Sequence, residues 1–312
     1  MIKKLYTKYN KNLGIKFFNN PNTINYNIFN ILYKNLIMRN KLSNDHINEF
    51  HKKGFFKTKV SSNKLVELIN DKVIKPQEDK IIPGTKKHIF FLPDNIKEEI
   101  INLISDDYKK IIEDLEIFYN NKISITEIVV RRNYPLNNEK YYKNKLRAKE
   151  MEVYNNYYHV DYYVSAFFKM FVNLSEVKSE NGPLHIYDIK ATGDYLKKFK
   201  YNSRFDYEPN ELIDKLNINS GKPGESFIAD TTKCLHRAGV VEKNYRDILF
   251  VVFGLIPKKF KSLNIRDSLK YFNTISENSI WDHSGKFTKI YKPKNLRQTL
   301  KLFWKLKNSK IN

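Results

Sequence analysis

Two histidines and one aspartate are spaced so that they could hold one metal ion. In His159-Val160-Asp161 the imidazole and the carboxylate stand two positions apart, so on an extended strand both side chains leave the same face. His236 lies 75 residues beyond Asp161. Two histidines and one carboxylate can occupy one face of an octahedral metal ion and leave the other face open, as in non-haem iron(II) sites. The sequence therefore predicts that His159, Asp161 and His236 are metal ligands and catalytic residues.

An arginine follows the second histidine by ten residues and opens a strand-like run. Arg246 precedes the apolar stretch 247–253. An arginine that points inward from a strand can bind a carboxylate with two parallel hydrogen bonds, and a buried guanidinium without an anion is costly. We expect Arg246 to bind an anionic ligand if it points inward. The alternative is that it faces solvent or pairs with a structural acid.

Short strand-like runs surround these residues and would have to position them. Turn-forming residues separate runs at 123–132, 162–174, 183–189, 226–230 and 248–255, a pattern typical of a β-barrel or β-sandwich. Helices are expected N-terminal to these runs at 46–54, 61–70 and 94–119, the last capped by Asp94. A further helix is expected between two of the runs, at 206–216. Two largely irregular segments, 133–150 and 190–224, are expected to carry specificity, the first as a loop or lid.

Length and composition exclude several classes of protein. The chain has 312 residues and 41% hydrophobic residues, enough for a sizeable core and too many for wholesale disorder. Its single cysteine, Cys234, excludes a disulfide scaffold and any zinc site built on several thiolates. No apolar run approaches the ~18 residues of a membrane span, and the N-terminus lacks the apolar core of a signal peptide. We expect a soluble, cytoplasmic protein.

Positive charge is concentrated at the two ends. The formal net charge is +22; residues 1–44 carry eight Lys or Arg and residues 283–312 carry nine, with no acid in either segment. Such ends favour anionic partners, either a membrane surface to which the protein would bind peripherally or, less favoured, nucleic acid. The alternative is a compositional bias toward Lys, Asn, Ile and Tyr. We expect a basic arm at 1–44, a central domain at 45–257, and a basic extension at 258–312 with an amphipathic helix.

Several motifs in the same order resemble the phytanoyl-CoA dioxygenase family of iron(II)/2-oxoglutarate oxygenases. They are EFHKKGFF at 49–56, H-V-D at 159–161, NLSEV at 173–177, ENGPL at 180–184, GESFIAD at 224–230 and LHR at 235–237, followed by Arg246. The resemblance covers roughly residues 45–257. It implies an α+β protein with a mainly β core: a double-stranded β-helix, or jelly roll, with helices packed on one side.

The resemblance also implies a cofactor, cosubstrates and a reaction. His159, Asp161 and His236 would hold iron(II), and Arg246 would bind the distal carboxylate of the cosubstrate 2-oxoglutarate, with Phe171 lining its site. Arg131 or Arg132 would add a second contact, and strand alternation does not tell which. The implied reaction hydroxylates a small-molecule, lipid-linked or sugar-linked substrate with O2 and releases succinate and CO2. Related halogenases lack the carboxylate ligand, so Asp161 favours hydroxylation or desaturation.

The sequence departs from the family in two places. A Pro-Gly-Ser-His turn commonly follows G-P-L, but here Ile186 to Thr192 contains no such turn, and Ala238 stands where a small hydroxyl residue often helps to hold the cosubstrate. A different class of function remains open: a basic binding protein on a jelly-roll scaffold that associates with anionic membrane or nucleic acid. A nucleic-acid demethylase of the AlkB type would carry a second arginine where Val252 stands.

Overall fold

A computed structural model describes the central part of the chain. The described residues are 45–119, 122–136, 153–161, 168–198, 205, 207–255, 264–269 and 297. The expected basic arm, the lid segment after residue 136 and the C-terminal amphipathic helix, apart from Arg297, lie outside them. Among the described residues, no helix is both long enough and apolar enough to cross a bilayer.

Within the described ranges, nine strands form two antiparallel sheets. The large sheet has the order β1-β7-β4-β9-β3-β2, and the small sheet has the order β6-β5-β8. The bounds are β1 Phe55–Ser61, β2 Lys87–Phe90, β3 Ile123–Asn133, β4 Phe168–Asn173, β5 Leu184–Ile186, β6 Asn217–Asn219, β7 Glu225–Ala229, β8 His236–Ala238 and β9 Arg246–Leu255. Sequence neighbours are rarely neighbours in the large sheet, so residues far apart in the chain meet on its faces.

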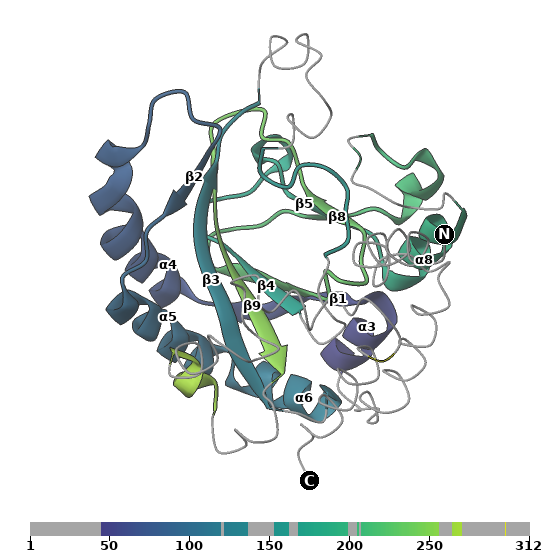
Figure 1. The fold of residues 1–312 in the computed structure, drawn as a ribbon, viewed down its shortest axis with the longest axis horizontal. Coiled ribbons are helices and arrows are strands. Elements are labelled where there is room, and N and C mark those ends of the chain that lie inside the picture. The colour runs from purple at the N-terminus through teal and green to yellow at the C-terminus, as the bar shows by residue number, and fades with distance from the viewer. Residues whose placement is uncertain are drawn as a thin grey trace, which may run out of the picture.

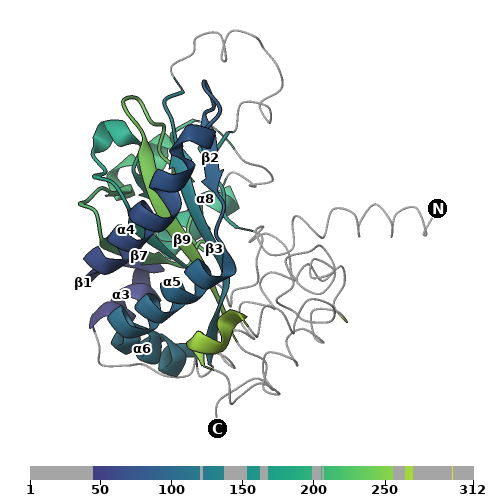
Figure 2. The ribbon, with the colours of Figure 1, turned by 90° about the vertical axis from the view of Figure 1, so that its left-hand side faces the viewer.

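Helices cover one face of the large sheet, and the small sheet lies on the other side. Helices α4 and α5 lie on one side of β3 and β9, whereas β5 and β8 lie on the other (Figure 1). Turned by 90°, α4 and α5 lie in front of the strands (Figure 2). The helices are α3 Asp45–Lys53, α4 Asn63–Ile69, α5 Asp94–Asp107, α6 Lys109–Tyr119 and α8 Ile189–Lys198, with 3-10 or π turns at Asn70–Ile74, Lys75–Lys80, Ser179–Asn181, Asn210–Lys215 and Ile265–Asp267.

Strand alternation divides the buried residues into two cores. On β4, Met170 and Val172 pack with the helices in the outer core, whereas Phe171 packs on the opposite face. There it meets Phe227 of β7 and Ile186 of the small sheet, so this inner core lies between the two sheets. Two facing antiparallel sheets with helices on one side confirm the mainly β core with packed helices that the sequence predicted.

Some expected elements differ in detail. The single helix expected at 94–119 is two helices, because the chain breaks at Tyr108, and Asp94 lies in the first turn after the cap residue Pro93. The helix expected at 206–216 is a short 3-10 turn. Helix α8 lies in a segment expected to be irregular, and the edge strand β2 was not foreseen. Sequence periodicity missed the Tyr108 break because the apolar face continues across it.

Candidate metal and anion site

The three predicted metal ligands come together between the sheets. His159 and His236 form an antiparallel bridge, with hydrogen bonds of 3.0 and 2.9 Å between their backbone N–H and C=O groups. The Asp161 N–H donates to the Thr231 carbonyl at 2.9 Å, which ties the aspartate to the loop before β8. His159 and Asp161 therefore lie in an irregular segment held by backbone bridges, just before the strand-like run expected at 162–174.

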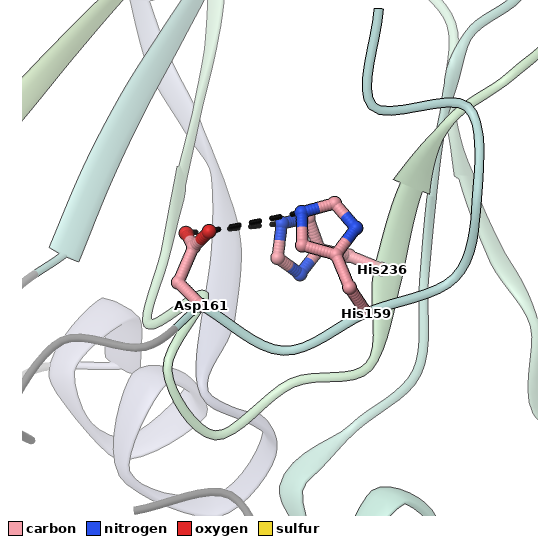
Figure 3. A group of neighbouring side chains, drawn as sticks. All are labelled: His159, Asp161 and His236. Atoms are coloured by element: carbon pink, nitrogen blue, oxygen red, sulfur yellow. Dashed lines mark ion pairs between the residues drawn. The ribbon is translucent and has the colours of Figure 1, made fainter. Parts of the chain in front are cut away.

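The ligand atoms of these residues form one compact cluster. One nitrogen or oxygen from each residue lies within 4.8 Å of the others, and all three residues are buried. His159 Nε2 is 3.7 Å from Asp161 Oδ1, and His236 Nε2 is 3.9 Å from Asp161 Oδ2; both pairs are drawn in Figure 3. Since a metal ion sits ~2.1 Å from a nitrogen or carboxylate ligand, an ion between each pair fits these separations.

Backbone carbonyls fix the tautomer of both imidazoles. His159 Nδ1 lies 2.7 Å from the Tyr157 carbonyl, and His236 Nδ1 lies 2.9 Å from the Cys234 carbonyl. A carbonyl only accepts hydrogen bonds, so each Nδ1 carries the proton and each Nε2 presents its lone pair toward Asp161. This is the arrangement in which imidazole binds a metal through Nε2. The cluster is therefore suited in both geometry and protonation to a divalent cation.

Asp161 also meets a lysine that the sequence did not single out. Lys169 Nζ of β4 lies 2.6 Å from Asp161 Oδ2, and only 13% of the lysine side chain is exposed. Burial alone would raise the pKa of Asp161, but the ammonium of Lys169, and after it the positive charge that each imidazole carries when protonated, outweigh this and hold that pKa below its usual range. Asp161 is therefore present as the carboxylate that a metal ligand must be.

Arg246 points inward and is buried, as one of the two alternatives predicted. It is 2% exposed, and it donates from Nη1 to the carbonyl of Gly182. Its Nε is buried without a hydrogen-bond partner. Burial, together with the nearby charge of Arg131, lowers the pKa of Arg246. No described acid makes an ion pair with Arg246, so the alternative of a structural acid finds no support in the described part of the chain.

The ENGPL segment supplies the backbone carbonyl, that of Gly182, to which Arg246 donates a hydrogen bond. Gly182 has a φ of 69°, and a Cβ there would lie 2.4 Å from the carbonyl oxygen of Gly239, so a side chain does not fit. The Gly239 N–H donates to the Pro183 carbonyl at 2.8 Å, which holds this turn against the end of β8. The motif therefore places a free carbonyl at the Arg246 guanidinium.

The structure separates the two arginines that the sequence left as alternatives. Arg132 faces the outer side of the sheet, where Nε and Nη2 each donate to Asp247 at 2.7 Å. Arg131 faces inward, its guanidinium 5.4 Å from the centre of the Phe250 ring, and its buried Nε has no hydrogen-bond partner. Burial lowers the pKa of Arg131 to about 10, which still leaves it charged at neutral pH. Arg131 is therefore the one that can join Arg246.

Asn133 is a third residue, beside Arg131 and Arg246, with buried polar atoms that have no hydrogen-bond partner. Asn133 of β3 pairs directly with Arg246 of β9, and both atoms of its buried amide lack a hydrogen-bond partner. Directly opposite residues share one face of an antiparallel sheet, so Asn133 and Arg246 point the same way. Buried polar groups normally find partners, and three unsatisfied ones together indicate that a polar ligand belongs there. With two guanidinium groups, this position is suited to an anion.

Phe171, predicted to line the cosubstrate site, and two residues near the sequence motifs, Cys234 and His185, lie in different surroundings. Phe171 is 9% exposed and packs in the inner core, with its ring centre 6.5 Å from that of Phe250. Cys234 is buried, and its thiol donates to the Lys53 carbonyl. His185, the neighbour of G-P-L, faces away from the metal cluster toward Glu208 and Arg237. Phe171 and Cys234 thus belong to the inner core, whereas His185 lies outside it.

Comparisons with known proteins found solved structures of partly similar shape and no match in sequence. No family model matches the chain, and no curated protein matches its sequence. Among solved structures, EctD from S. alaskensis with 2-oxoglutarate and 5-hydroxyectoine is 15% identical over 71% of this chain and 81% of that chain, with a TM-score of 0.46. HygX from Streptomyces hygroscopicus with nickel and 2-oxoglutarate is 13% identical over 69% and 88%, with a TM-score of 0.45. The non-heme alpha ketoglutarate dependent epimerase SnoN is 10% identical over 68% and 82%, with a TM-score of 0.44.

Proposed function

We propose that the chain is an iron(II)/2-oxoglutarate-dependent dioxygenase that hydroxylates a small-molecule, lipid-linked or sugar-linked substrate. One observation carries this proposal: a buried His159–Asp161–His236 cluster shares the inner side of the sheets with two inward-facing arginines, Arg131 and Arg246, which form no ion pair with any acid of the described residues and whose buried Nε atoms have no hydrogen-bond partner. The first set of residues suits a divalent metal, and the second suits the carboxylate of a dicarboxylic acid.

The metal would be held by His159 Nε2, His236 Nε2 and an oxygen of Asp161. Two neutral nitrogens and one carboxylate, with room for further ligands, are the donor set typical of iron(II) oxygenases. Bound there, iron(II) would supply the activation of O2. The Tyr157 and Cys234 carbonyls would keep both imidazoles oriented through their Nδ1 protons.

The cosubstrate would be anchored at its distal carboxylate by Arg246, as the family resemblance suggests. Arg131 and Asn133 would add a second guanidinium and an amide donor, and the inward position of Arg131 supports it over Arg132 as the second contact. Phe171 and Phe250 would line the carbon chain between the metal and the arginines. A charged hydrogen bond to a buried guanidinium explains why a dicarboxylic oxo acid would be bound in preference to a monocarboxylic one.

The proposed reaction balances without another reductant. One oxygen atom of O2 enters the substrate as a hydroxyl group, and the other enters succinate as 2-oxoglutarate loses CO2. Asp161 occupies the ligand position that halogenases leave open for halide, which supports hydroxylation or desaturation. The buried position of the cluster supports the role of the chain in excluding bulk water from the reacting atoms.

Further proposals follow from the family resemblance. We assign the catalytic domain to residues 45–257, with the two sheets as a double-stranded β-helix of the phytanoyl-CoA dioxygenase type. The basic segments at 1–44 and 258–312 would associate peripherally with an anionic membrane from the cytoplasm. What supports this last proposal is their charge alone.

Oxygen-dependent consumption of 2-oxoglutarate tests the proposed function. Purified protein with iron(II), ascorbate, O2 and 2-oxoglutarate should form succinate slowly even without substrate, and removal of iron with a chelator should stop it. Asp161→Ala should reduce succinate formation to the level of free iron(II), because the metal loses its only anionic ligand from this cluster. Succinate formation in the wild type no faster than in Asp161→Ala would reject the proposal.

A further inference from the structure

One carboxylate contacts both of the segments that carry the metal-binding histidines. Tyr158 donates from its hydroxyl to Glu208 Oε1 at 2.5 Å, and Arg237 donates from Nη2 to Glu208 Oε2 at 2.7 Å. Tyr158 directly precedes His159, and Arg237 directly follows His236. The two oxygens of Glu208 therefore hold the sequence neighbours of both histidines.

The strand register places Tyr158 directly opposite Arg237. His159 and His236 are antiparallel partners that exchange both of their backbone hydrogen bonds, so the next residue pair is one without backbone hydrogen bonds between its members. Side-chain contacts join the two segments at this level instead. The Arg237 guanidinium lies 4.6 Å from the centre of the Tyr158 ring, and Glu208 bridges the two side chains.

The hydrogen bond to each imidazole orients that ring only within its own segment. His159 bonds to the carbonyl of Tyr157, and His236 bonds to that of Cys234, each two residues earlier in the chain. These local bonds set the direction of each ring and leave the distance between the two segments to other contacts. A metal ion needs both nitrogens at ~2.1 Å, so it tolerates only a small change in that distance.

Tyr158 and Arg237 point away from the metal cluster, because successive side chains of an extended segment alternate between its faces. On this outer side, Tyr158 packs in an apolar cluster with residues of α8. The side chain of Arg237 is 14% exposed and that of Glu208 is 25% exposed, and His185 Nδ1 lies 3.2 Å from the Tyr158 hydroxyl. Charged hydrogen bonds in such a partly enclosed network are stronger than those on an open surface.

We propose that Glu208 is a positioning residue that fixes the separation of the His159 and His236 imidazoles from the side opposite the metal. The inference rests on the proposed function, because it concerns the metal that this cluster would hold. It also gives a role to part of the segment 190–224, which was expected to carry specificity. Through Glu208, that segment is tied to both of the chain segments that would bind the metal.

Cobalt(II) binding to the full-length, metal-free protein tests this inference. Competition with a coloured chelator measures the affinity, and the visible absorption of the bound ion reports its coordination geometry. In Glu208→Gln, a donor replaces one of the two acceptor oxygens, so Tyr158 and Arg237 can no longer both donate to this side chain as they do now. We expect the affinity to fall about tenfold and the shape of the cobalt spectrum to change at saturating metal.

Glu225→Gln is the matched control. Glu225 is 31% exposed and pairs with Lys57 at 2.7 Å, on strands that carry none of the three metal ligands. Its cobalt affinity should change by less than about twofold, whereas the urea midpoints of the two metal-free variants should fall by similar amounts. A merely structural role for Glu208 would move only the midpoint.

Tyr158→Phe removes the hydroxyl and keeps the ring beneath Arg237. We expect it to weaken cobalt binding about threefold. Adding it to Glu208→Gln should cost less than a further twofold, because both changes break the same link. If Glu208→Gln does not fold, Tyr158→Phe alone decides, and an unchanged affinity in that variant rejects the inference.

The other outcomes overturn distinct claims. An unchanged affinity and spectrum in Glu208→Gln, or an equal loss of affinity in Glu225→Gln, rejects the positioning role. Losses that multiply in the double variant would show that Tyr158 and Glu208 act separately, which also rejects it. If the wild type binds no cobalt, or His236→Ala binds it equally tightly, the metal site and the proposed function fail, and this is seen before any Glu208 variant is measured.

Discussion

Arg131 and Arg132 are neighbours on β3, and their guanidinium groups meet opposite surroundings. Arg132 lies on the outer face with Asp247 directly across the sheet, and two hydrogen bonds of 2.7 Å join them. Arg131 lies on the inner face opposite Ile248, with a buried Nε that has no hydrogen-bond partner. A paired buried arginine contributes to the fold, whereas an unpaired one is a cost that ligand binding can recover.

Arg246 and Arg237 repeat the same contrast on β9 and β8. Arg246 is 2% exposed and has only a backbone carbonyl as hydrogen-bond acceptor. Arg237, on the outer side of the small sheet, donates to Glu208 at 2.7 Å and lies over the Tyr158 ring. The inner arginines are therefore suited to bind an anion, whereas each outer arginine already has a carboxylate partner.

The largest effect is expected from breaking the outer pair. Asp247→Asn removes the buried carboxylate partner of the Arg132 guanidinium and leaves it the half-exposed Glu78, and we expect the free energy of unfolding to fall by about 3 kcal/mol. Urea unfolding measures this change. Glu78→Gln is the control, because Glu78 is half exposed and its loss should cost less than about 1 kcal/mol. Equal losses in the two variants would contradict the structural role of the Arg132–Asp247 pair.

Removal of Arg246 should act on the ligand and spare the fold. We expect Arg246→Met to weaken 2-oxoglutarate binding about 100-fold, because a buried carboxylate would lose its charged donor. Binding of 2-oxobutyrate, which has no distal carboxylate, should change by less than about twofold. Anaerobic titration of the iron(II) protein with both acids measures this difference. A similar loss for both acids would mean that Arg246 acts on the metal end.

Removal of the Arg131 side chain should also weaken 2-oxoglutarate binding, by a smaller factor than removal of Arg246. Arg131→Met should weaken 2-oxoglutarate about tenfold, since Arg246 and Asn133 still bind the carboxylate. The same change should raise the stability of the ligand-free protein by about 1 kcal/mol, because an uncompensated buried charge is removed. Thermal unfolding with and without 2-oxoglutarate measures both effects. Lower stability in the ligand-free variant would show that Arg131 supports the fold.

The smallest effect concerns the outer Glu208–Arg237 pair and its pH dependence. Burial alone would raise the pKa of Glu208, but His185, Tyr158 and Arg237 outweigh it and lower that pKa. The stabilisation is therefore fully present above the unfolded-state pKa of about 4.3 and is lost as the pH falls through the lower folded-state value. Wild type and Glu208→Gln should differ by less than about 1 kcal/mol at pH 7 and converge below about pH 4. A difference that grows in acid would contradict this sign.

Much of the fold and of the metal cluster could be predicted because local pattern determines them. The alternation of β4 and β9 and the spacing of His159 and Asp161 are visible in the sequence. Alternation shows that Arg131 and Arg132 point to opposite faces of the sheet, but it does not show which of the two faces inward. The pairing of β3 with β9 and the helices on the outer face decide this. Lys169 was missed for a related reason, since only tertiary contacts bring its ammonium to Asp161.

The visible spectrum of the anaerobic protein with iron(II) and 2-oxoglutarate tests the central claim most directly. The account predicts a metal-to-ligand charge-transfer band in the wild type, which requires the keto acid to bind iron held by this cluster. The band should be absent in His236→Ala, and in Arg246→Met it should appear only at about 100-fold higher 2-oxoglutarate. Absence of the band in the wild type, or an undiminished band in His236→Ala, would contradict the account.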